Sequence, residues 1–79
     1  DKAEQLLLDL GFHQLRVRIH DKLARIELDQ SEFDKIMQKD IREEVYFKLR
    51  EYGFSYVSLD LLGYRTGSMN ETIDTKSDK

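Results

Sequence analysis

The fold of this chain is decided by the stretch Leu15-Arg-Val-Arg-Ile-His-Asp-Lys-Leu-Ala-Arg-Ile-Glu-Leu28. Apolar and polar side chains alternate along both halves of it, and this period of two is typical of half-buried β-strands. A two-residue turn at residues 21–22 makes the halves an antiparallel hairpin with one apolar face. Asp-Lys is not a favoured turn pair, so a longer loop or a bulge that shifts the register stays open. The unshifted register pairs Leu15 with Leu28, Val17 with Ile26 and Ile19 with Ala24.

The opposite face of this hairpin carries the charges. It pairs Arg18 with Arg25 and Arg16 with Glu27, and like charges directly opposite one another are unfavourable. Three guanidinium groups on one face form a set suited to binding phosphate or sulfate, which would relieve the repulsion. The alternative is a solvated face, on which Glu27 and Asp60 are surface ion-pair partners that contribute roughly 0 to 1 kcal/mol each.

Helical spacing frames the hairpin on both sides. An amphipathic pattern from Ala3 ends at Gly11, a residue that favours a helix C-terminus. After the hairpin, Ser31 with Asp34 and then Asp40 with Glu43 resemble N-terminal capping pairs. The sequence therefore predicts a helix over 3–10, a short helix over 33–37, a break near residue 39, a longer helix over 40–52 and a last strand over 56–62.

This order predicts an α+β fold of the form α-β-β-α-β. A right-handed connection from the second strand to the third, with the first strand between them, gives a three-stranded antiparallel sheet of order 2-1-3 with the helices packed on one face. Eight side chains are then expected in the interior: Leu15, Val17, Ile19, Ala24, Ile26, Val57, Leu59 and Leu61.

The length of 79 residues is enough for one domain of modest stability. We assign it to residues 1–68. Residues 69–79 contain one aliphatic side chain and no periodicity, and we expect a disordered tail there. The chain begins inside a helical pattern without a start methionine, and we expect it to be a fragment of a longer protein.

Composition narrows the classes of function. A net charge of −3 with 37% charged residues argues against a nucleic-acid binder driven by an excess of basic residues. The chain has no cysteine, which excludes a disulfide framework, a thiolate metal site and a cysteine nucleophile within it. No apolar run approaches the roughly 20 residues of a membrane span. We therefore expect a cytoplasmic protein without membrane contact.

A second candidate site follows the last strand. The loop at residues 63–68 places Arg65 and Ser68 between glycines, where backbone N–H groups and a guanidinium can meet an anion. Glycines beside an arginine are also ordinary turn chemistry. Glu4, Glu27 and Asp60 offer oxygen ligands, but their spacing specifies no metal. We predict no catalytic residue, because no nucleophile–base pair, Walker loop or zinc pattern is present.

Three motifs together resemble a known family. They are R-x-R-x-H at residues 16–20, A-R-I-E at 24–27 and L-D-x-x-G-Y-R-[ST]-G-S-x-N at 59–70. With Ala3-Glu4, Leu10-Gly11-Phe12 and Gly53-Phe54, this series is similar to the C-terminal domain of the LarE-type, PP-loop ATP pyrophosphatases, which are ATP-dependent sacrificial sulfur transferases. The similarity covers residues 3–70.

The resemblance implies roles for several residues. Arg16 and Arg18 match paired arginines that hold phosphate or sulfate near the active site, and Glu4 matches an acidic residue implicated in metal or substrate handling. Arg25, Glu27, Asp60 and Arg65 match motif positions to which we assign no individual role.

The resemblance also implies partners. ATP and Mg would bind an N-terminal PP-loop domain of the same chain through an S-G-G-x-D-S loop, and the full-length protein can form homo-oligomers. This chain contains neither that loop nor the sacrificial cysteine, so we expect it to be inactive alone and to hold no cofactor.

These observations support a leading function and two alternatives. The leading interpretation is the substrate- or anion-binding and assembly domain of a sulfur transferase, whose ligand is a small molecule that bears phosphate or sulfate. The first alternative is a non-catalytic module that senses anions or nucleotides. The second is an RNA-binding domain, since Tyr56 shares the sheet face with the arginines, although the negative net charge disfavours it.

Overall fold

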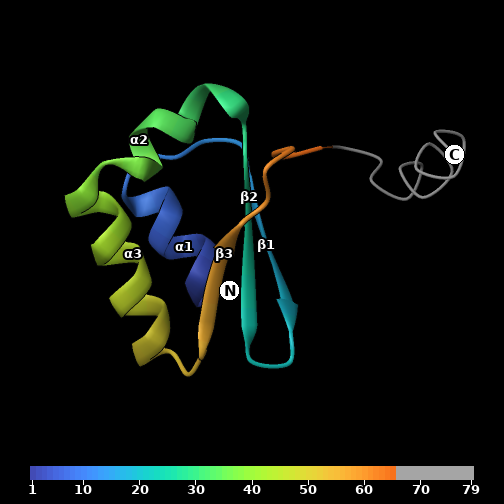
Figure 1. Ribbon diagram of the computed structural model, residues 1–79, viewed down its shortest axis with the longest axis vertical. Helices are drawn as coiled ribbons and strands as arrows, with labels where there is room; N and C mark the ends of the chain where they lie inside the picture. Colours follow the sequence, from blue (N-terminus) through green and yellow to red (C-terminus); the bar gives the residue numbers. More distant parts are fainter. Residues whose placement is uncertain (66–79) are drawn as a thin grey trace, which may run out of the picture.

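The computed structural model describes residues 1–65 and confirms an α+β fold (Figure 1). Every helix in this range lies on one side of a three-stranded sheet, and the other side of the sheet is uncovered by helices. In chain order the elements are α1 (Lys2–Asp9), β1 (Leu15–His20), β2 (Leu23–Leu28), the short 3-10 helix η1 (Gln30–Glu32), α2 (Phe33–Met37), α3 (Lys39–Glu51) and β3 (Tyr56–Leu59).

The hairpin register predicted from the alternation is confirmed. Leu15 pairs with Leu28, Val17 with Ile26 and Ile19 with Ala24. The unfavourable Asp-Lys turn is accommodated because Asp21 adopts a positive φ of 54°, a conformation that aspartate tolerates better than most residues. No bulge or longer loop is therefore needed.

The predicted strand order 2-1-3 is wrong. The order is β1-β2-β3, and β3 pairs with β2 in parallel. The crossover through α2 and α3 returns the chain to the side of β2 that the hairpin leaves open, where Asp60 N–H donates to the Ile26 carbonyl at 2.8 Å. The other edge is already occupied, because the Glu4 carboxylate of α1 accepts the outward-facing N–H of Val17 at 3.0 Å. The sheet is mixed, with β2 in the centre.

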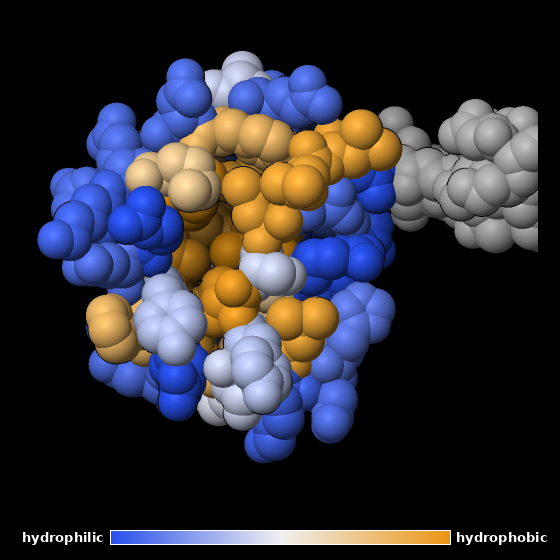
Figure 2. Space-filling view, in the orientation of Figure 1, coloured by the Kyte–Doolittle hydropathy of each residue, from blue (hydrophilic) through white to orange (hydrophobic). Residues whose placement is uncertain are grey.

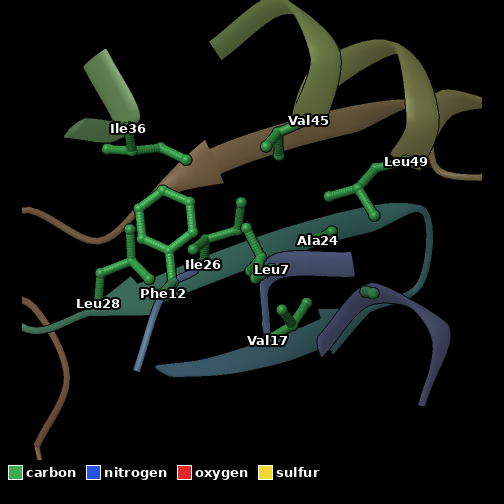
Figure 3. Packing of buried hydrophobic residues seen from close by; sticks show 10 residues of the cluster. Leu7, Phe12, Val17, Ala24, Ile26, Leu28, Ile36, Val45 and Leu49 are labelled. Carbon is green, nitrogen blue, oxygen red and sulfur yellow. The ribbon is translucent and has the colours of Figure 1, made fainter. Parts of the chain in front are cut away.

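The core lies between the sheet and the helices (Figure 3). Of the eight side chains expected there, Val17, Ala24 and Ile26 are buried, and Leu15, Val57 and Leu59 are partly buried against the core. Helices and loops add Ala3, Leu7, Phe12, Ile36, Val45 and Leu49, and β2 adds Leu28.

Two of the expected core residues are exposed. Ile19 is 51% exposed and lies one residue before the end of β1, beside the hairpin turn. Leu61 is 86% exposed because β3 ends at Leu59, earlier than predicted, and residues 61–62 form a turn. The predicted strand was too long because the alternation of apolar and polar residues continues in the sequence beyond Asp60, where the turn begins.

The helix boundaries come close to those predicted, with different caps. Asp1 caps α1 by accepting the Glu4 N–H at 2.9 Å. The break before α3 falls at Gln38, whose backbone is extended, and its side chain makes no capping bond. Asp29 caps the η1 turn by accepting the Ser31 N–H, in place of the expected pairing of Ser31 with Asp34. Within residues 1–65, no helix is long and apolar enough to cross a membrane. The predicted tail lies outside the described residues.

Candidate functional site

The face of the sheet opposite the helices carries a group of charged residues, which we call the arginine face. They come from β1, from β2 and from the segment that follows β3. Strand alternation places these side chains opposite the core-facing ones. The members are Arg16 and Arg18 on β1, Arg25 and Glu27 on β2, and Asp60 and Arg65 after β3.

Glu27 is the centre of this face. It is only 1% exposed, and its Oε2 accepts from Arg18 Nε at 3.3 Å and from Arg25 Nη2 at 3.4 Å. Arg18 and Arg25 are direct cross-strand partners, so a buried carboxylate separates two like charges that would otherwise repel. The other oxygen of Glu27, Oε1, is buried and has no hydrogen-bond partner among the described residues.

Asp60 extends the charge network from β2 to the turn after β3. Its Oδ2 lies 3.6 Å from Arg25 Nε, and its Oδ1 accepts from Arg65 Nη1 at 3.2 Å and from the Leu62 N–H at 2.9 Å. Burial raises the pKa of Asp60, but the Arg65 and Leu62 hydrogen bonds, with the positive charges of Arg65 and Arg25, outweigh it and leave that pKa below its ordinary value. Asp60 is therefore an ionised link between two arginines at neutral pH.

The turn at Gly63 brings Arg65 to the network. Gly63 is buried with φ +93°, and a Cβ there would lie 2.7 Å from the Leu28 carbonyl oxygen. Tyr64 N–H then donates to the same carbonyl at 2.7 Å, so the chain continues alongside β2 beyond the end of β3. Glycine is required by both the positive φ and the close approach. This explains the first glycine of the predicted anion loop, and residues 66–68 of that loop, Ser68 included, lie outside the described residues.

The structure brings most of the predicted site residues together. Arg18, Arg25, Glu27, Asp60 and Arg65 form one connected set of contacts. Arg16 lies on the same face and is exposed, and within residues 1–65 it makes no ion pair. This face therefore carries four arginines and two carboxylates on a chain whose net charge is −3, which concentrates positive potential on one surface.

Glu4 does not belong to the arginine face. Its carboxylate binds the Val17 N–H at the free edge of β1, from a helix on the core side of the sheet. The three carboxylates Glu4, Glu27 and Asp60 consequently do not converge. Among residues 1–65, no group of three or more histidine or acidic side chains is placed to hold a metal ion.

The sequence interpretation missed two features of the structure, one on the arginine face and one on the helix side of the sheet. Glu27 was treated as a surface ion-pair partner, but it is buried, because β2 lies in the centre of the sheet whereas the predicted order placed it at an edge. The second feature is an apolar groove of about 440 Å³ beside β3, seen as a hollow in Figure 2. Its lining includes the exposed side chains of Met37 and Phe47, which were assigned only to helices.

Comparison with known proteins finds relatives that match nearly the whole of this chain. Over 71 residues, the chain is 42% identical to pyridinium-3,5-bisthiocarboxylic acid mononucleotide synthase of Lactiplantibacillus plantarum, and the match covers 90% of this chain and 25% of that protein. It is 39% identical over 72 residues to an uncharacterized protein of Synechocystis sp., covering 91% of this chain and 27% of that protein. No protein-family model matches the chain.

The chain thus spans about a quarter of the length of the curated relatives it matches. A small α+β domain with a basic sheet face fits a fragment of a LarE-like protein.

Proposed function

We propose that this chain is the C-terminal substrate-binding and assembly domain of a LarE-like, ATP-dependent sulfur transferase of the PP-loop superfamily, and that it is inactive alone. The arginine face is its anion-binding surface. The observation that carries this proposal is the Arg18–Arg25 pair, which two adjacent strands hold side by side around the buried Glu27. A merely solvated face would let long charged side chains separate into water.

The ligand is a small molecule with phosphate or carboxylate groups. The named relative is a synthase of a mononucleotide that bears two thiocarboxylic acid groups, and such a molecule is anionic. Guanidinium groups bind phosphate and carboxylate with charge-assisted hydrogen bonds. In the whole protein, ATP and Mg bind a separate N-terminal PP-loop domain of the same chain, and the arginine face supplies the anion-binding groups of the C-terminal domain. The protein works in the cytoplasm.

Arg16 offers the cleanest test, because it is exposed and, among residues 1–65, forms no ion pair with another residue of the face. We expect pyrophosphate to shift the backbone amide resonances of residues 16–18 and 25 more than those of the helices. The dissociation constant should be about 1 mM, equivalent to roughly −4 kcal/mol, because the site is open to water. Arg16→Gln should weaken binding severalfold without changing the thermal midpoint by more than the effect of about 0.5 kcal/mol usual for exposed substitutions.

The matched control is Lys39→Gln, which removes the same charge from the exposed start of α3. Equal weakening by both variants, or equal shifts throughout the chain, would reduce the effect to net charge and contradict a site. A sensing module would bind the anion equally well. An activity assay of the full-length protein distinguishes the two functions, because Arg16→Gln should lower the rate of sulfur transfer only if the arginine face binds the substrate. Tighter binding of single-stranded RNA than of pyrophosphate would favour the RNA-binding alternative.

A further inference from the structure

The free edge of β3 is an interaction surface with unused hydrogen-bonding groups. Tyr56 N–H donates to Lys22 and Asp60 N–H donates to Ile26, so alternate residues of β3 direct their backbone groups toward β2. Val57 and Leu59 must direct their N–H and C=O groups the other way. Within residues 1–65, no hydrogen bond from another element reaches these groups.

An apolar groove runs beside this edge. It is lined by residues of β3, of α3 and of the end of α2, and Figure 2 shows it as a hydrophobic hollow on the face in view. Phe47 is 60% exposed and Met37 is 51% exposed there. Exposed edge strands are usually protected by charge, proline or a bulge, and the four residues Tyr56–Leu59 include no charge or proline.

We propose that β3 pairs with β3 of a second copy of this chain, antiparallel about a two-fold axis at Ser58, to form a continuous six-stranded sheet. This inference rests on the assembly role in the proposed function and names its surface. In this register Val57 of each copy lies opposite Leu59 of the other copy, which gives two symmetric pairs. Within each pair, both residues donate their N–H to the carbonyl of the other. A two-fold interface requires such self-complementarity.

Side chains favour a second copy over an unrelated strand. On the groove side, Val57 of one copy meets Leu59 of the other, which continues the apolar surface across the axis. On the opposite side the two Ser58 side chains meet, and neither carries a charge. The groove wall includes Arg42 and Glu43, so each copy supplies both signs of charge to the rim.

Ser58→Lys tests the interface without disturbing the core. Ser58 is exposed, and its partner in the proposed register is Ser58 of the second copy, so the variant places two ammonium groups across the axis. Gln5→Lys is the matched control: it adds the same charge on α1, where Asp9 is four residues away. Phe47→Ser independently removes apolar surface from the groove.

The measurement is sedimentation equilibrium of the 79-residue chain from about 10 µM to about 1 mM, with far-UV circular dichroism of each variant to confirm folding. We expect a dimer whose dissociation constant rises about tenfold or more in Ser58→Lys, rises less in Phe47→Ser and is unchanged in Gln5→Lys. A monomer throughout this range, or a dimer that survives Ser58→Lys, would overturn the proposal. Ser58 is the cross-strand partner of Arg25, so Ser58→Lys also adds charge to the arginine face. Phe47 lies on α3, on the other side of the sheet, so the pyrophosphate titration of Phe47→Ser reports on the anion site separately.

Discussion

At the outer edge of β1, the Glu4 carboxylate accepts the outward N–H of Val17, and the strand itself carries two arginines, Arg16 and Arg18. Along the free edge of β3, the outward groups of Val57 and Leu59 meet no such partner within residues 1–65, and apolar side chains surround them. The difference follows from the helices. Helix α1 lies beside β1 and can extend an acidic side chain over its edge, whereas α3 lies over β3 and leaves a groove. One edge is therefore closed against other strands, and the other is available for assembly.

Ion pairs on the arginine face connect the two outer strands through β2, the central strand. Glu27 binds Arg18 of β1, and Arg25 continues from Glu27 to Asp60 at the end of β3. The arginine face is thus one network that spans the whole sheet. Removing its centre should have a larger effect than changing either edge.

Glu27→Gln should cause the largest effect, a loss of about 1 to 3 kcal/mol in the free energy of unfolding. The substitution keeps the shape but removes the negative charge that separates Arg18 from Arg25, and the amide can accept only through its oxygen. Urea denaturation measures the loss. Glu44→Gln, on the exposed side of α3, is the control and should change stability by no more than about 0.5 kcal/mol. Equal stability of the two variants would show that the buried carboxylate is not a structural centre.

Glu4→Gln should have a smaller effect, about 1 kcal/mol, confined to the β1 edge. Glu4 contributes a charge-assisted hydrogen bond to Val17 N–H, and the amide oxygen of glutamine is a weaker acceptor. Hydrogen exchange at the Val17 amide should accelerate, while exchange in β2 should change little. If exchange at Val17 is unchanged, the β1 edge is not closed by this carboxylate, and the contrast between the edges fails.

The sequence was most informative where a pattern is local. The hairpin register followed from alternation, and it correctly placed Arg18 opposite Arg25 and the core-facing side chains of β2. The helices followed from their spacing. These features depend on residues that are near one another in the chain, so periodicity and caps are sufficient to predict them.

The strand order could not be obtained in this way. Whether β3 joins β1 or β2 depends on which edge a distant side chain covers, and Glu4 is thirteen residues from Val17. The burial of Glu27 depends on the same choice, because β2 becomes central only when β3 pairs with it. Anion binding stays a prediction for every residue to which it was assigned, namely Arg16, Arg18, Arg25, Arg65 and Ser68.

The acid side of the stability profile gives the smallest effect and tests the β3 end of the network. The pKa of Asp60 is lowered in the folded state, so on acidification the unfolded chain takes up this proton first. The stability that Asp60 contributes is complete well above its unfolded pKa of about 3.9 and is lost as the pH falls through the lower folded value. In Asp60→Asn, the free energy of unfolding should be lower than in the original chain at neutral pH, and the difference should shrink as the pH falls below about 4. Chemical denaturation across this range measures the difference, and a carboxyl-detected NMR titration measures the pKa of Asp60 directly. A gap that stays constant from neutral to acidic pH would mean that the ionised carboxylate does not hold Arg25 and Arg65, and that the charge network ends at Glu27.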